Sequence, residues 1–191
     1  FLVFGLAGLM WWRRHALAGA TRSWVVFFVG VSAVAFGSGY YHLFPNSATL
    51  VWDRLPMTIG FMGLFVALLS EHLNPRLESW LLLPALIIGA ASVAWWHFTD
   101  DLRFYAWVQF MPLLIIPLVL ALFPARFTHR GYLLYGLAAY ILAKVAEFYD
   151  RELFAATAQI LSGHSLKHLV AAGAPLAVYA MLKRRSALTT R

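Results

Sequence analysis

Cysteine is absent from the 191 residues, and charged side chains make up only 12% of them. The first absence excludes disulfides, cysteine-ligated zinc and iron–sulfur clusters. The second argues against an ordinary soluble domain, in which about 25% of residues are charged. No polar segment is long enough to form a separate soluble domain, so we expect one membrane-embedded domain over residues 1–191.

Acidic residues are also scarce, with 8 Asp and Glu against 15 Lys and Arg, which gives a formal net charge of +7. A basic protein can bind nucleic acid, but here the charges do not cluster on a polar domain. Basic loops on the cytoplasmic face of a membrane protein explain them better. We therefore expect the bilayer, and no nucleic acid, as a partner.

Long apolar runs, bounded by charges and helix breakers, predict an all-α integral membrane bundle of seven transmembrane helices. Continuous apolar runs do not fit a β-barrel, which needs alternating segments. The first run lacks a basic n-region and a cleavage site, so we expect a truncated first helix rather than a signal peptide. The predicted spans are 1–12, 24–44, 56–71, 79–98, 103–123, 131–150 and 164–182.

The basic residues orient this bundle, because Lys and Arg accumulate on the cytoplasmic side. The N-terminus is then predicted outside and the C-terminus in the cytoplasm, while Lys144 and Lys167 fall within or at the edge of spans. The predicted outer side carries only Arg54, Arg103 and Arg151. The predicted cytoplasmic side carries Arg13, Arg14, Arg22, Arg76, Arg126, Arg130, Lys183, Arg184, Arg185 and Arg191.

Five polar side chains are predicted at one membrane depth, near the outer ends of three spans. Ser38 and His42 lie four residues apart in "FGSGYYHLFPN", which places them on one helical face. Asp53 in "VWDRLPMT" precedes Pro56, a residue well tolerated in a first helical turn. His164 and His168 in "SGHSLKH" form a second pair with this spacing.

Three imidazoles with an open fourth position are typical of catalytic zinc. His42, His164 and His168 would supply the ligands, and bound water would have a pKa near 7. Asp53 could orient a ligand or accept the proton of the water. Ser38 could donate a hydrogen bond to a developing oxyanion.

Each residue also has a simpler interpretation. A lone histidine at a helix end is most often interfacial, Ser38 could bond to a neighbouring helix, and Asp53 could pair with Arg54. The conjunction at one depth favours the metal site. His97 is either a spare ligand or part of an aromatic belt, whereas the remaining histidines fall on the cytoplasmic side: His15, His72 and His129.

A second polar cluster lies in the sixth span, where Lys144, Glu147 and Asp150 recur at helical spacing. Charges inside a bilayer are costly, so these should face inward and pair, with Lys167 as a further partner. The favoured interpretation is a salt-bridge network that braces the last two spans. The alternative is a set of groups that orients the zinc ligands, with Glu147 as the best candidate.

The motifs "SGYYH", "WDRLPMT" and "SGHSLKH" resemble the alkaline ceramidase family, within the CREST superfamily of seven-helix membrane hydrolases. The resemblance implies zinc held by His42, His164 and His168, with Asp53 acting on the bound water and Ser38 stabilising the oxyanion. It also implies a ceramide-like membrane lipid as the substrate. Eukaryotic members bind calcium through an acidic N-terminal segment, but no Asp or Glu precedes Asp53 here, so calcium stays an open question beside zinc.

Two other functions remain open at this stage. A haem-binding electron carrier would use histidine pairs as axial ligands and would leave Ser38 and Asp53 without roles. A receptor or transport protein with a structural metal would bind zinc without turnover. The sequence does not indicate an oligomeric state.

Overall fold

A computed structural model describes residues 1–15 and 19–188, and Arg191 of the predicted cytoplasmic group lies outside them. Within these ranges the secondary structure is helical, apart from an isolated bridge between Phe127 and Ala187. The predicted all-α class is confirmed. The chain forms two compact units, one of residues 1–128 with the C-terminal tail from Ser186, and one of residues 129–185.

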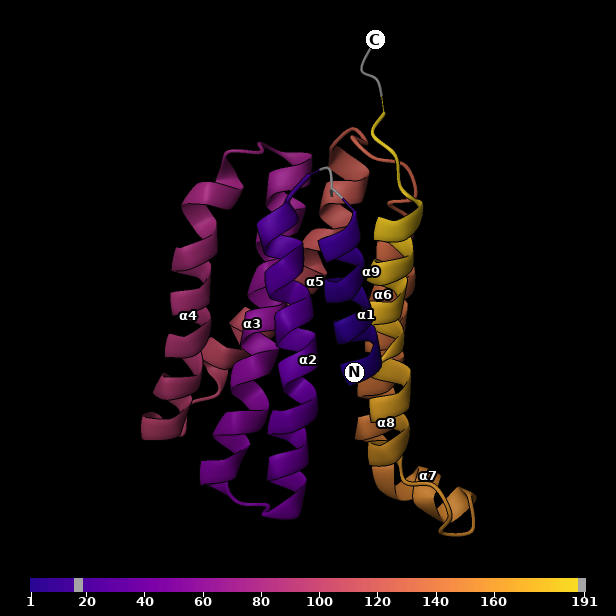
Figure 1. Cartoon of the computed structure of the whole chain (residues 1–191). Helices are drawn as coiled ribbons and strands as arrows, with labels where there is room; N and C mark the ends of the chain where they lie inside the picture. Colours follow the sequence, from indigo (N-terminus) through magenta and orange to yellow (C-terminus); the bar gives the residue numbers. More distant parts are fainter. Residues whose placement is uncertain (16–18, 189–191) are drawn as a thin grey trace. The chain divides into compact units, whose positions relative to one another are not determined.

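The first unit contains five helices, labelled in Figure 1. Helix α2 packs chiefly along α3, and α3 also packs against α4 and α5. Their bounds are α1 Leu2–Arg14, α2 Thr21–Leu43, α3 Ser47–His72, α4 Leu77–Thr99 and α5 Arg103–Leu122.

Glycines allow the backbones of α2 and α3 to touch. A Cβ atom at Gly30 would lie 2.3 Å from the amide nitrogen of Gly60, and one at Gly63 would lie 2.7 Å from that of Phe27. A Cβ atom at Gly37 would lie only 2.0 Å from the carbonyl oxygen of Trp52. Small residues at a membrane helix interface permit this close approach, which fixes α2 tightly against α3.

The start of α3 differs from the prediction of a span beginning at Pro56. The helix begins at Ser47, so Asp53 lies inside it and Pro56 is an internal proline. The reason is a capping box: the Asn46 side chain accepts from the Thr49 amide at 2.9 Å, and Thr49 Oγ1 accepts from the Asn46 amide at 3.1 Å. Pro56 has no N–H to donate to the Trp52 carbonyl one turn earlier, and Gly37 of α2 lies against that same oxygen.

Two carboxylates hold the other end of α2. Glu71, which is buried near the end of α3, accepts from the indole N–H of Trp24 at 2.7 Å and from the Ala20 amide at 3.1 Å. Glu78 accepts from the Ser23 amide at 2.8 Å. Negative charge beside a helix N-terminus is favourable because the backbone N–H groups there have no helical partner.

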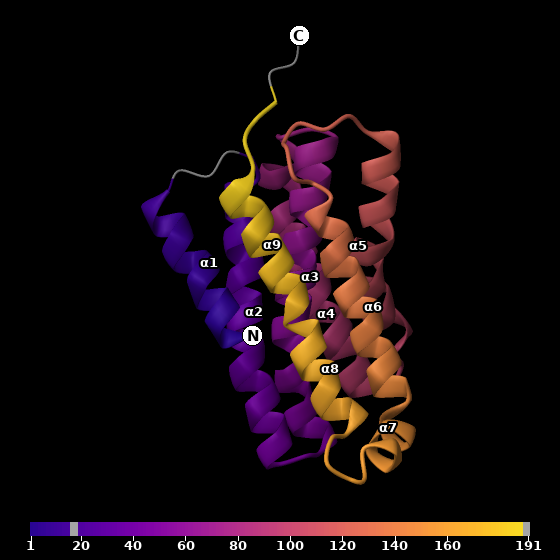
Figure 2. The same cartoon turned by 90° about the vertical axis from the view of Figure 1, so that its right-hand side faces the viewer.

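The second unit contains α6 Tyr132–Phe148, α7 Asp150–Ala156, α8 Gly163–Ala171 and α9 Gly173–Arg184. Helices α8 and α9 lie alongside α6 (Figure 2). The sixth span was predicted to continue to residue 150, but α6 ends at Phe148 and Asp150 begins the short helix α7. The last predicted span is divided at Ala172, shortly before Pro175, which cannot donate to the carbonyl of Ala171.

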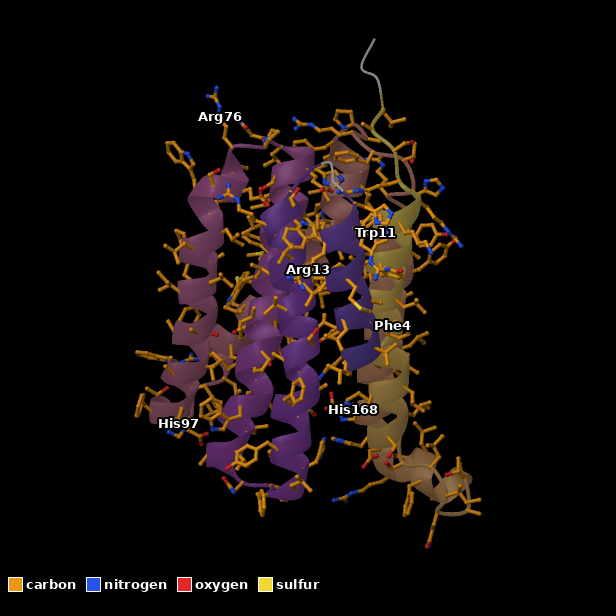
Figure 3. All side chains as sticks on the ribbon, viewed as in Figure 1. Phe4, Trp11, Arg13, Arg76, His97 and His168 are labelled. Atoms are coloured by element: carbon orange, nitrogen blue, oxygen red, sulfur yellow. The ribbon has the colours of Figure 1, made fainter. Side chains whose placement is uncertain are left out.

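Five segments in the described ranges are long and apolar enough to cross a membrane: α2, α3, α4, α5 and the joined α8 and α9. The chain therefore has the character of a multi-pass membrane protein. Helices α1 and α6, with 13 and 17 residues, are shorter than the 18 residues required, so the count of seven spans stays a prediction. Arg76 and His97 lie at opposite ends of α4 (Figure 3), as their assignment to opposite membrane faces requires.

Candidate metal centre

Helix α8 presents His164 and His168 on one face. Its first turn is fixed by Ser162, whose hydroxyl accepts from the Ser165 amide at 3.0 Å. The two imidazole centroids lie 4.9 Å apart with their planes at 69°. Both rings are half-buried, and their Nε2 atoms are separated by 3.2 Å (His168 is labelled in Figure 3).

This separation fits two ligands of one zinc ion. Zinc–imidazole bonds of about 2.0–2.1 Å in tetrahedral geometry place two ligand nitrogens about 3.3 Å apart. The same 3.2 Å also suits a hydrogen bond from one Nε2–H to the other Nε2. The donor set thus accommodates a metal without a change in the spacing of the two rings.

The position of α8 depends on Gly163, which is buried against the end of α6. A Cβ atom there would lie 2.1 Å from the Ala146 carbonyl oxygen and 2.7 Å from the Cα of Asp150. The Asp150 carboxylate accepts from the His164 amide at 2.6 Å, at the N-terminus of α8. The Asp150 side chain therefore anchors the backbone of α8. It does not extend the group of charged side chains that Lys144 and Glu147 form on α6.

Glu147 is the centre of an ion-pair network beside these histidines. Its Oε1 accepts from Lys167 Nζ at 2.9 Å, and its Oε2 accepts from Lys144. Lys167 also places Nζ 3.4 Å from His164 Nδ1. The pairing of Lys167 with Glu147 joins α8 to α6, which is the salt-bridge network favoured by the sequence analysis. Through Lys167 the network also contacts His164, a candidate metal ligand.

The first unit holds the other three predicted site residues. Ser38 is buried on α2, one turn before the exposed His42, whose ring centroid lies 5.3 Å from that of Tyr41 with the planes tilted by 54°. Asp53 is half-buried on α3, next to Trp52, the residue whose carbonyl contacts Gly37. The serine–histidine turn of α2 and the aspartate turn of α3 therefore belong to one tightly packed helix pair.

The structure accordingly divides the predicted site between the two units. Ser38, His42 and Asp53 belong to the first, whereas the histidine pair of α8 and the Glu147 network belong to the second. A single zinc ion with three histidine ligands stays a prediction.

Two features escaped the sequence analysis. Glu71 is a buried carboxylate whose partners, Ala20 and Trp24, lie about fifty positions away, as the separations of 51 and 47 show. Arg54 was considered as a partner of Asp53, but its guanidinium lies 3.8 Å from the Trp96 ring centroid and 5.1 Å from that of Tyr105. The apolar surroundings of Glu71 were the available signal in the first case. No local sequence pattern predicts that the Arg54 guanidinium lies against the two aromatic rings.

His97, which the sequence offered as a spare ligand, is exposed on α4, and its ring centroid lies 6.5 Å from that of Trp96 and 5.1 Å from that of Phe98. These aromatic neighbours favour the aromatic-belt interpretation, which stays a prediction.

Comparison of the chain with protein-family models, with curated proteins and with solved structures finds no match. The resemblance to alkaline ceramidases rests on the three motifs alone.

Proposed function

We propose that this chain is a zinc-dependent intramembrane amidase that hydrolyses ceramide-like lipids to a fatty acid and a long-chain base. The observation that supports it most is the 3.2 Å separation of the His164 and His168 Nε2 atoms, which suits two ligands of one ion. In this proposal His42 is the third ligand.

Zinc, when bound, supplies a water with a pKa near 7 and polarises the amide carbonyl of the substrate. The residues of the chain manage the proton and the developing charge. The Asp53 carboxylate accepts a proton as water adds to the carbonyl carbon, and it returns that proton to the nitrogen as the C–N bond breaks. The Ser38 hydroxyl donates to the carbonyl oxygen while it becomes negative. The products are a carboxylic acid and a free amine.

The membrane setting determines the class of substrate. Five apolar segments embed the chain in a bilayer, so a lipid can reach the site from the side. Tyr40 and Trp52, 47% and 55% exposed, flank Ser38 and Asp53 and provide aromatic surface for such a lipid. With the N-terminus outside and the C-terminus in the cytoplasm, the site lies towards the outer face.

The first test is elemental analysis of the detergent-purified protein together with its visible absorption spectrum. We expect about one zinc per chain, retained in His15→Ala and lost in His168→Ala. His15 is a matched control because it caps the end of α1, with its Nδ1 against the Trp11 carbonyl. Absence of zinc from protein never exposed to chelator would refute the proposal, and a Soret band would favour the haem-binding carrier instead.

The second test is fatty-acid release from ceramides in mixed micelles. Wild-type protein should release fatty acid, and Asp53→Asn should bind zinc normally but lose activity. Full activity of Asp53→Asn, or zinc binding without any turnover, would favour the structural-metal alternative.

A further inference from the structure

The Lys167 ammonium lies between a carboxylate and a candidate metal ligand. Its Nζ atom is 2.9 Å from Glu147 Oε1 and 3.4 Å from His164 Nδ1, and its side chain is only 19% exposed. Lys144 contacts the other oxygen of Glu147 and is 42% exposed. Two lysines thus share one carboxylate. Lys167 also lies close to Nδ1 of His164, the ring nitrogen that does not face His168.

The position of Lys167 determines which nitrogen of a neutral His164 ring carries the proton. An ammonium group has only donors, so the Nδ1 that it faces must present a lone pair. The proton then sits on Nε2, which can donate to His168 Nε2 at 3.2 Å. This arrangement is self-consistent without a metal, because each group in the row from Lys167 to His168 has a suitable partner.

A metal reverses this arrangement. An Nε2 that binds zinc has no proton, so the ring proton must be on Nδ1, where it would point at the Lys167 ammonium. Metal-bound histidines usually donate their other N–H to a carboxylate, a carbonyl or water. Glu147 is already joined to this ring through Lys167, and its two oxygens can accept more bonds than the two lysines supply.

We propose that Lys167 and Glu147 are positioning residues with opposite effects on metal loading, an inference that rests on the proposed zinc site. Lys167 holds the metal-free ring through Nδ1 and disfavours the metal-bound form. Glu147 draws Lys167 away and accepts a hydrogen bond from the Nδ1–H group when the metal is bound.

The test is the zinc affinity of the detergent-purified full chain, measured by competition with a chromogenic chelator. Lys167→Met should bind zinc roughly five- to tenfold more tightly, since a unit positive charge near the cation is removed. Glu147→Gln should bind about 10- to 100-fold more weakly. Lys144→Met is the matched control, because it has the same carboxylate partner without the contact to His164, and it should stay within about twofold of wild type.

A second readout does not depend on activity. The imidazole ¹⁵N chemical shifts of His164, assigned by their loss in His164→Gln, should show an unprotonated Nδ1 in metal-free protein and a protonated Nδ1 after zinc is added. Lys167→Met should remove the preference for the first form.

The outcomes separate this inference from the function on which it rests. If wild-type protein binds no zinc, both fail. If it binds zinc but Lys167→Met binds equally or more weakly, or Lys144→Met matches Lys167→Met, the positioning roles are wrong and the amidase proposal stands.

Discussion

Replacing Gly37 by alanine tests whether the close contact between α2 and α3 holds Ser38 and Asp53 in their relative positions. The new Cβ atom would lie 2.0 Å from the Trp52 carbonyl oxygen and 3.2 Å from Pro56 Cγ. Carbon–oxygen contacts across helix interfaces are about 3.3–3.6 Å, so the two backbones must separate by more than about 1 Å. Neither the carbonyl oxygen nor the proline ring can rotate away.

The expected cost follows from this overlap. Overpacking of a tight interface lowers the free energy of unfolding by about 1–3 kcal/mol. Each kcal/mol should lower Tm by about 2–4 °C in a chain of this length. Separation also moves Ser38 relative to Asp53, and a displacement of about 1 Å at a catalytic group can reduce activity about 100-fold.

Gly39→Ala is the matched control, because Gly39 lies two residues further along α2 and its Cβ would meet nothing within 4 Å. Alanine is the better helix former, so Gly39→Ala should be neutral or stabilising by up to about 1 kcal/mol. The assays are thermal unfolding in detergent and fatty-acid release for both variants. Equal Tm values for the two variants would refute the close contact, and an unstable but fully active Gly37→Ala would refute its role in positioning Ser38.

Three further perturbations follow from the same kind of reasoning. Gly163→Ala should lower Tm and weaken zinc binding, because its Cβ would lie 2.1 Å from the Ala146 carbonyl, whereas Gly131→Ala, which meets nothing within 4 Å, should leave both unchanged. Glu71→Gln should lower the free energy of unfolding by about 1–3 kcal/mol by weakening a buried acceptor of two N–H groups, while the exposed Glu152→Gln should not change Tm. Side-chain and backbone hydrogen bonds from Arg103 lower the pKa of Asp101 to about 2, from 3.8. Because this pKa is depressed in the folded chain, the pairing is present above pH 4 and is lost as the pH falls through about 2. A carboxyl ¹³C titration should show Arg103→Gln returning the pKa of Asp101 towards 3.8, and an unchanged midpoint would contradict this pairing.

Helices with uninterrupted apolar sequence were predicted closely. The expected spans 24–44, 79–98 and 103–123 correspond to α2 Thr21–Leu43, α4 Leu77–Thr99 and α5 Arg103–Leu122. The larger errors fall where one local signal competes with another. At α3 the capping box of Asn46 and Thr49 overrides the tendency of Pro56 to mark a helix start.

The candidate site was predictable to the extent that it is local. The spacing of four residues between His164 and His168 is enough to place two rings on one turn, and the cost of lone charges in a membrane predicts the pairing of Glu147 with Lys167. The contact between Lys167 and His164 Nδ1 depends on side-chain torsions that spacing does not specify. The role of Glu71 depends on the packing of α2 along α3, for which the sequence carries no local signature.

The ion pair between α6 and α8 also has a consequence for how the chain enters a bilayer. A lysine at the centre of an inserting helix costs roughly 2.5–3.5 kcal/mol on its own. Lys167 lies near the start of the last apolar segment, Gly163–Arg184, so it would carry only part of that cost, and its partner Glu147 lies on α6, which emerges first and is connected through the short helix α7. The two segments should therefore be integrated together as a hairpin with the charges already paired, so Glu147→Leu should make insertion of the last segment less efficient during synthesis.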